Sequence, residues 1–361
     1  MVTWDAVVVG GSVAGSTVAR ELARRGLDVA LVEKARFPRP KACGEGLLPH
    51  GVAALSAMGL DASGPRVRGL RFVSPSGVTA EADFPSGHGV VVRRERFDEQ
   101  LFRAAARMPG VTAFEGTPYD PDRFPARWVV GADGLRSQFH GRPEFPASPP
   151  AVTRVGFSTH VRGLEIDRDR VEVILHESGE IYLAPSERDE ALVACLFRKD
   201  AVPPGSSNED RVLHVLLSLD VLEGRTHGIS FTTPVLAVAP LGLRVGAVTS
   251  GNTLLVGDAA GAPDPVTGEG MSLAILSARS AAAAIAAGRP AEYERERRRL
   301  AAGSEWLGRW MLRATRYPAI ADRAVRSLVE HPDLFTKLLE ISAGARQEGD
   351  LTLADMARLL V

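Results

Sequence analysis

Residues 7–16 read VVVGGSVAGS, and this stretch decides the expected fold. A β-branched run over 6–9 comes before the glycines, and a helical pattern over 14–25 follows them. A second apolar run over 29–32 then ends at Glu33. Strand, glycine turn, helix and strand in this order form a βαβ unit, which begins a parallel sheet. The sequence therefore predicts an α/β protein.

The glycine turn has the pattern of a dinucleotide-phosphate site. Gly10 and Gly15 take the first and third glycine positions of the fingerprint, and Ser12 stands at the second. Such a turn brings backbone N–H groups close to a pyrophosphate at a helix N-terminus, where the Ser12 hydroxyl could also donate. Glu33 could accept from the hydroxyls of an adenosine ribose. The contacts expected from this segment are Gly10, Ser12, Val13, Ala14, Gly15, Glu33 and Lys34.

Two later segments repeat the strand-then-turn pattern. GADG at 131–134 follows a predicted strand over 128–130, and GDAAG at 257–261 follows one over 253–256. The second continues as DPVTGEGM over 264–271 into an alanine-rich helix over 271–287. Because this layout is similar to the amino-terminal one, we expect a distant segment to complete the first domain.

With these three motifs in this order, residues 1–290 resemble the FAD-dependent oxidoreductases of the p-hydroxybenzoate hydroxylase and geranylgeranyl reductase superfamily. The resemblance implies that Asp258 contacts the ribityl chain or pyrophosphate and that Pro265 lies near the reactive flavin edge. It also implies that backbone N–H groups at 268–271 meet flavin N1 and O2, where a helix dipole stabilises the anionic reduced ring. The implied FAD contacts here are Arg94, Asp133, Gly134, Gly257, Asp258, Pro265, Gly268, Gly270 and Met271.

The loop PRPKACGEG at 38–46 is similar to the Pro-Arg-x-Lys-x-Cys-Gly-x-Gly loop of the geranylgeranyl reductase branch. The resemblance implies that Cys43 and Gly44 lie against the flavin and the substrate cavity. Cys43 is then either a proton donor or a small packing residue. Tyr182 is either a substrate contact or a half-buried strand tyrosine, and His50 is an acid–base candidate near the loop. Cys43, Tyr182 and His50 are the three catalytic candidates.

The expected domains are discontinuous. Residues 1–150 and 236–290 form a Rossmann-like FAD-binding domain, and 45–90 contribute in part to the substrate cavity. Alternating residues over 151–235 predict an antiparallel substrate-binding sheet with one buried face, and 291–361 predict a helical C-terminal region. Relatives usually carry a three-stranded excursion before the Asp-Gly motif. Here 110–126 leave room only for a loop or one hairpin, which could expose a surface for a partner.

Composition limits the partners, the metal sites and the cellular compartment that we expect. Lys plus Arg number 43 and Asp plus Glu 44, a net charge of −1, which argues against a nucleic-acid partner. Two cysteines, no signal peptide and no long apolar stretch favour the cytoplasm. The eight histidines show no spacing typical of a metal site. Nine arginines, three acidic residues and two tryptophans over 295–326 allow peripheral membrane contact, but packing on the cofactor domain or on a dimer mate is favoured. No oligomeric state is predicted.

The motifs and the resemblance leave three alternative functions. The first is an NADH- or NADPH-dependent monooxygenase that hydroxylates an aromatic or polyketide-like molecule through a flavin hydroperoxide. The alternative is a flavoenzyme that reduces C=C bonds of an isoprenoid or lipid. The third is a non-catalytic flavin-binding partner protein. Chlorination is not expected, since the Trp-x-Trp pattern and catalytic lysine motif of flavin halogenases are not evident.

Overall fold

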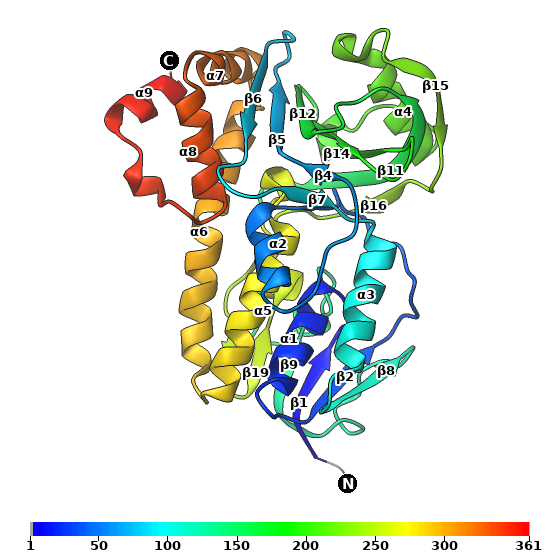
Figure 1. Cartoon of the computed structure of the whole chain (residues 1–361), viewed down its shortest axis with the longest axis vertical. Coiled ribbons are helices and arrows are strands. Elements are labelled where there is room, and N and C mark those ends of the chain that lie inside the picture. The colour runs from blue at the N-terminus through cyan, green and yellow to red at the C-terminus, as the bar shows by residue number, and fades with distance from the viewer. Residues whose placement is uncertain (1–2, 361) are drawn as a thin grey trace.

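The computed structural model describes residues 3–360 and holds two stacked layers, each built on one large sheet (Figure 1). The first sheet has the strand order β18-β19-β9-β1-β2-β8, and every pairing in it except β18–β19 is parallel. Its strands are β1 (Trp4–Val9), β2 (Val29–Glu33), β8 (Val111–Glu115), β9 (Ala126–Gly131), β18 (Thr249–Ser250) and β19 (Thr253–Leu255). The predicted α/β fold, completed by a distant segment, is confirmed.

Helices cover the front of this sheet in Figure 1. They are α1 (Val13–Ala23), α3 (Arg94–Ala106) and α5 (Gly270–Ala286), and α2 (Pro49–Ser56) packs on α5. Helix α1 lies between α3 and α5, and its residues Ala14, Val18 and Ala19 are buried. β1 and β2 are almost wholly buried, which is why they read as continuous apolar runs.

The segment 110–126 differs from the prediction of a loop or hairpin. Its first half is β8, which pairs parallel with β2 as the edge strand of the first sheet. The second half brings Phe124, 3% exposed, onto Phe114 with ring centroids 4.9 Å apart. Tyr119 stacks on Phe124 and on Phe139. The shortened segment thus covers this region with its own aromatic side chains.

The second sheet has the order β15-β11-β14-β13-β12-β5-β6, with β16 also on β11. The strands predicted within 151–235 pair antiparallel, whereas β12 and β5 are parallel because β5 and β6 arrive from 69–83. Its strands are β5 (Gly69–Val73), β6 (Thr79–Asp83), β11 (Arg154–Leu164), β12 (Arg170–His176), β13 (Gly179–Pro185), β14 (Ala191–Arg198), β15 (Thr226–Phe231) and β16 (Leu236–Val238).

Both faces of this sheet are covered, so the expectation of one buried face is wrong. Helix α4 (Asn208–Ser218) packs Val212, Val215 and Leu216 on one face. Helices α7 (Pro318–Glu330) and α8 (Pro332–Ser342) cover the β6 and β12 end of the other. The rest of that face meets the first layer. The alternation over 151–235 therefore distinguishes residues that pack under α4 from residues that face the first layer or α7 and α8, and not core from solvent.

The C-terminal region is helical, as predicted. Helix α6 (Pro290–Ala314) runs beside α5, and α9 (Leu353–Leu360) ends the described chain (Figure 1). Trp306 and Leu307 pack with α7 and α8, and the rings of Trp306 and Trp310 lie 6.1 Å apart. Within residues 3–360, no helix is long and apolar enough to cross a membrane. The membrane contact of 295–326 stays a prediction.

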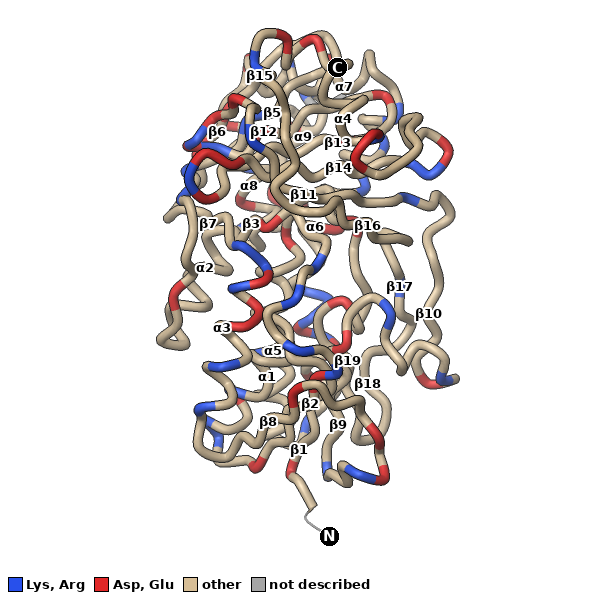
Figure 2. The backbone as a smooth tube through the Cα atoms, turned by 90° about the vertical axis from the view of Figure 1, so that its right-hand side faces the viewer, with Lys and Arg blue, Asp and Glu red and all other residues tan. Residues whose placement is uncertain are grey.

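Short strands join the layers. They are β3 (Gly46–Leu47), β4 (Arg66–Val67) and β7 (Gly89–Val91), which form a small sheet, and the pair β10 (Ala147–Ser148) and β17 (Arg244–Val245). Charged residues of both signs are interspersed along the chain in Figure 2. The site described next lies where the two layers meet.

Candidate active site

The three glycine motifs converge on the start of α1. A Cβ on Gly10, whose φ is +105°, would lie 2.4 Å from the Ala132 carbonyl oxygen, so the 131–134 turn touches the first turn directly. A Cβ on Gly15 would lie 1.7 Å from the Gly10 oxygen, which leaves room for glycine alone. A Cβ on Gly257 would meet Ala14 at 2.8 Å from the other side. Segments more than 200 residues apart thus form one cradle.

Glu33 ends β2 beside this cradle. Its Oε2 accepts from the Gly11 amide at 2.8 Å and its Oε1 from the Ala35 amide at 2.8 Å, and the side chain is buried. The Arg39 guanidinium lies 3.7 Å away. Glu33 therefore shapes the glycine turn as well as presenting a carboxylate at its edge. Lys34, next along the chain, is exposed.

Arg94, at the start of α3, forms a buried ion pair behind the glycine turn. Its Nε donates to Asp98 Oδ1 at 2.9 Å and its Nη2 to the Ser12 hydroxyl at 3.1 Å. That hydroxyl donates in turn to Asp98 Oδ2 at 2.6 Å, so its proton is not directed at a phosphate as we expected. Burial opposes the charge on Arg94, but Asp98 raises its pKa. Arg94 reaches the cradle through Ser12.

A second helix N-terminus, that of α5, opens onto the same region. Gly268, with φ +72°, and Gly270 are exposed, and a Cβ on either would meet nothing within 4 Å. Glu269 between them is buried and accepts from the Ser342 hydroxyl at 2.7 Å. His50 Nε2 lies 2.8 Å from its other oxygen. His50 thus contacts the residue between the two glycines of this turn, and its acid–base role stays a prediction.

The 257–271 segment faces the loop that carries Cys43. Asp258 is about one-third exposed, and Lys41 Nζ lies 3.3 Å from its Oδ2. Pro265 begins the turn before α5, and Met271 is buried in the first turn of that helix. The Asp258 carboxylate therefore remains reachable while Lys41 holds the loop beside it.

The loop 38–46 bridges the two layers. The Cys43 amide donates to the Ser158 hydroxyl on β11 at 3.1 Å, and Gly44 faces Ala194 on β14. Glu45 has φ +55°, and its amide donates to Cys43 Sγ at 3.3 Å. These contacts seat a partly exposed thiol between the glycine cradle and the second sheet.

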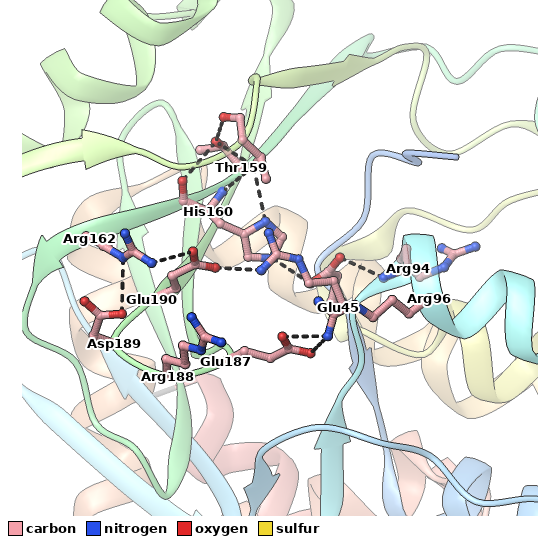
Figure 3. A network of polar contacts seen from close by, with 12 residues as sticks. Glu45, Arg94, Arg96, Thr159, His160, Arg162, Glu187, Arg188, Asp189 and Glu190 are labelled. Carbon is pink, nitrogen blue, oxygen red and sulfur yellow. Dashed lines mark hydrogen bonds and ion pairs between the residues drawn. The ribbon is translucent and has the colours of Figure 1, made fainter. Parts of the chain in front are cut away.

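The Glu45 carboxylate continues the bridge (Figure 3). Its Oε1 accepts from the Arg94 amide at 3.0 Å, and its Oε2 lies 2.9 Å from His160 Nε2 on β11. Both side chains are less than one-tenth exposed. One glutamate therefore joins the start of α3, the cysteine loop and the second sheet.

A second buried network joins the sheet to the turn before α5. Arg154 on β11 pairs with Asp264 at 2.6 Å and with Glu180 on β13. Burial raises the pKa of Glu180 even though Arg154 opposes the shift. The Tyr182 hydroxyl donates to the Val266 carbonyl at 2.7 Å, which joins β13 to this turn, and its contact with a substrate stays a prediction. Burial raises the pKa of Tyr182 well above its ordinary value.

The expected residues from both ends of the chain thus meet at one site. Sequence reasoning missed several polar side chains that position the turns. One signal was available: polar residues at alternate positions of β11 share the face that meets the first layer. The missed residues are Glu45, Asp98, Arg154, Ser158, His160, Glu180, Asp264, Glu269 and Ser342.

These residues fit a bound FAD. Helices α1 and α5 both begin without a side-chain cap, so their first N–H groups are available to a phosphate and to a flavin ring. The open glycines of the α5 turn, and Gly134, leave space for a planar group. Asp133 Oδ1 is buried without a hydrogen-bond partner in the described structure, while Oδ2 accepts from the Gln138 amide.

Comparisons with known proteins agree with this geometry. A family model described as FAD dependent oxidoreductase matches residues 5–46, and one described as FAD binding domain matches residues 103–302, more than half of the chain. Menaquinone reductase of Mycobacterium tuberculosis is 29% identical over 321 residues, covering 77% of this chain and 75% of the relative. Digeranylgeranylglycerophospholipid reductase 1 of Methanothermobacter thermautotrophicus is 26% identical and covers 81% of each chain.

Solved structures share the fold. The flavin-dependent brominase Bmp2 superposes with a TM-score of 0.84 at 20% identity, covering 99% of this chain and 97% of that one. A geranylgeranyl bacteriochlorophyll reductase-like protein of Thermoplasma acidophilum gives 0.74 at 20% identity, covering 99% and 96%. At these identities the likeness shows the fold alone. Together with the family match, the converging turns identify the chain as a member of the FAD binding domain family and an FAD-dependent oxidoreductase.

Proposed function

We propose that this enzyme reduces C=C bonds of an isoprenoid chain in a lipid or quinone. The observation that carries the proposal is the seating of the 38–46 loop, which holds the Cys43 thiol where the cofactor cradle meets the second sheet. The loop has the motif of the geranylgeranyl reductase branch. The curated relatives named above are reductases of menaquinone and of digeranylgeranylglycerophospholipid, molecules that carry isoprenoid chains.

Reduction of a C=C bond needs a hydride donor and a proton donor. When bound, the reduced flavin supplies a hydride to one carbon of the double bond, and the other carbon must receive a proton. Cys43 is the proton donor that we propose, because its partly exposed thiol lies in the bridging loop. We propose NADH or NADPH as the source of the two electrons.

Anaerobic turnover tests the proposal. Purified enzyme, NADH or NADPH and an isoprenoid quinone or geranylgeranyl lipid are incubated without oxygen, and the product is examined by mass spectrometry. We expect a mass gain of two hydrogen atoms for each double bond reduced. Replacing Cys43 with Ser should slow the formation of this product by at least about tenfold, because a general acid commonly contributes about 100-fold or more to the rate. Turnover that depends strictly on oxygen would contradict reduction.

Hydroxylation is a second candidate. It is favoured by the polar residues at alternate positions of β11, where the Ser158 hydroxyl accepts from the Cys43 amide and keeps a proton that it can donate to a phenol. The test is oxygen uptake coupled to oxidation of the nicotinamide in the presence of an aromatic substrate. Incorporation of one oxygen atom into the product would support this candidate.

A further inference from the structure

The corner where α6 ends and α7 begins presents an exposed apolar surface. It lies toward the end of the molecule opposite the N-terminus (Figure 1). Tyr317 is 53% exposed and Ile320 is 47% exposed, and Pro318 and Ala319 between them are exposed as well. We call residues 317–320 the apolar corner. Because transfer of such side chains out of water is favourable, four of them in a row form a surface suited to contact with an apolar partner.

The tryptophans of α6 do not belong to this surface. Trp306 and Leu307 pack into the apolar cluster formed with α7 and α8, and Tyr182 of β13 packs on the same cluster. Trp310 is partly buried, with its ring centroid 6.1 Å from that of Trp306. The fold thus turns the tryptophan side of 295–326 inward and leaves the apolar corner on the outside.

Four arginines flank the apolar corner. Arg309 and Arg313, four residues apart on α6, lie on the same side of that helix. Arg316 directly precedes the corner, and Arg323 follows it by three residues on α7. All four are exposed, and none of them forms an ion pair with another residue between 3 and 360. We call these four residues the corner arginines.

Acidic residues around the corner are few. The stretch 305–326 holds five arginines and two acidic residues. One of these, Asp322, accepts from the Ser76 amide at 2.9 Å and so ties α7 to the turn between β5 and β6. The other, Glu305, lies one helical turn before Arg309, and no ion pair joins the two in the described structure. The chain itself therefore leaves the positive charge at the corner without close compensation.

Two of the corner arginines stack on aromatic rings. Arg313 Cζ lies 5.9 Å from the Trp310 ring centroid, and Arg316 Cζ lies 5.9 Å from that of Tyr317. Stacking of this kind holds a guanidinium against an apolar ring and leaves the N–H groups at its edge able to donate. Such groups bind phosphate through paired hydrogen bonds. The corner therefore places apolar side chains and phosphate-binding groups side by side.

An anionic lipid surface matches both features. Its phosphates can pair with the corner arginines, while the boundary between headgroups and acyl chains takes up Tyr317 and Ile320. A nucleic acid offers phosphates but no hydrocarbon. A second copy of this chain in a two-fold contact would place the same arginines opposite one another, which like charges disfavour. The charge and the apolar side chains together favour the lipid.

The end of α6 also packs directly on the candidate active site. A Cβ on Gly308 would lie 3.4 Å from Val266 Cγ1, so this helix contacts the turn that precedes α5. Arg309, the first of the corner arginines, is the next residue along the chain. A membrane bound at the corner would therefore lie on the helix that supports the cofactor side of the site.

We propose that the apolar corner and the corner arginines dock the enzyme on the surface of membranes that contain anionic lipid. The apolar corner enters the interface, and the arginines pair with lipid phosphates around it. Docking itself does not depend on the reaction that the enzyme catalyses. Its purpose, which is to take a substrate with an isoprenoid chain from the membrane, rests on the proposed function.

Vesicle flotation tests the docking. Protein with its flavin bound is mixed with vesicles of phosphatidylcholine alone, or of phosphatidylcholine with phosphatidylglycerol. We expect binding to the second kind only, and binding that weakens as salt is added. Arg313→Ala combined with Arg316→Ala should lower the vesicle affinity by about 30-fold, which corresponds to about 1 kcal/mol for each arginine. Wild-type protein that ignores the anionic vesicles, or binds both kinds equally, would overturn the proposal.

Two further variants separate this surface from general charge attraction. Arg107→Ala combined with Arg127→Ala removes two exposed arginines of the first layer and should bind as the wild type does. An equal loss in this control would overturn the proposal. Tyr317→Ser combined with Ile320→Ser keeps the charge and should lose the binding that persists at high salt. If that variant instead dissociates a dimer, seen by analytical ultracentrifugation, the corner belongs to a second copy and the proposal fails.

Anaerobic turnover separates docking from the proposed function. Reduction of a substrate embedded in anionic vesicles should fall in the Arg313 and Arg316 double variant, while reduction of the same substrate in detergent stays at the wild-type rate. Equal loss in vesicles and in detergent would overturn the docking role. Docking without reduction of any isoprenoid substrate would leave the surface standing and refute the reductase.

Discussion

Removing the carboxylate of Asp98 should lower the free energy of unfolding far more than removing an exposed carboxylate of the same helix. Asp98 is 0% exposed and Arg94 is 4% exposed, and they share two hydrogen bonds at 2.9 and 3.1 Å. Asp98→Ala leaves the Arg94 guanidinium buried without its counterion and leaves the Ser12 hydroxyl without its acceptor. Breaking a buried pair in this way costs about 3–5 kcal/mol. We expect that loss in the free energy of unfolding.

The same helix supplies the control. Arg96, two residues from Arg94, pairs with Glu187 at 2.6 Å, but the side chains are 70% and 37% exposed. Because exposed pairs are screened by water, Arg96→Ala should cost less than about 1 kcal/mol. Urea unfolding of both variants at one pH measures the contrast, and flavin absorbance of the purified proteins reports the cradle. Equal costs for the two variants would refute the argument from burial.

A double variant separates loss of the pair from an uncompensated charge. Arg94→Met combined with Asp98→Leu removes both charges and fills similar volume, so it should recover most of the stability lost by Asp98→Ala. It should not recover flavin binding if the Arg94 contact to Ser12 shapes the phosphate turn. A double variant as unstable as Asp98→Ala would show that packing rather than charge explains the cost.

The contribution of Asp98 should also depend on pH in one direction. Burial alone would raise the pKa of Asp98, but Arg94 lowers that pKa below its ordinary value. A lowered carboxyl pKa gives stabilisation that is fully present above the unfolded value of about 4 and is lost as the pH falls through the folded value. The difference in unfolding free energy between the wild type and Asp98→Ala should therefore stay constant between about pH 8 and 5 and shrink only below about pH 4.

Three further outcomes are expected. Gly15→Val places its side chain against the Gly10 carbonyl, where a Cβ alone would lie at 1.7 Å, so the protein should lose flavin and unfold at lower urea. Asp258→Ala should purify with little yellow colour while its circular dichroism stays native, and full flavin occupancy would contradict the assignment. Tyr182→Phe leaves the Val266 carbonyl without its donor and should cost about 1–3 kcal/mol in urea unfolding, and a neutral effect would mean that water replaces the hydroxyl.

Much of the site was predictable because its glycines and strands are local signals. The turn at Gly10 needs a positive φ, and the close approach at Gly15 admits no side chain, so glycine is required at both positions. The strands that lead into the first and third motifs end in fully buried residues and read as apolar runs. Residues whose role depends on a distant partner were less visible. In the sequence, Glu45 is only a variable position of a loop motif, and its role becomes visible when β11 places His160 beside it.

The partners of the predicted polar residues were also not visible in the sequence. His50, Tyr182 and Ser12 were assigned by their nearness in sequence to a motif, and each contacts a group from elsewhere in the chain: Glu269, the Val266 carbonyl and Asp98. The alternation over 151–235 predicted the strands correctly, but the expectation that one face of their sheet meets solvent was wrong. Polar residues at alternate positions of a strand can indicate a face that meets another layer, as on β11, but they do not show which residue lies opposite, since neither partner's position constrains the residues around the other.

The amino-acid sequence by itself determined that this chain binds a dinucleotide through a parallel α/β sheet, because a phosphate turn requires particular residues within a few positions of one another. Tertiary structure alone decided which buried polar groups pair between α3, the 38–46 loop and β11. These pairs form only when the two layers pack on each other, because the free energy of a buried charge depends on its distance to every neighbour in space and not on its neighbours in the chain.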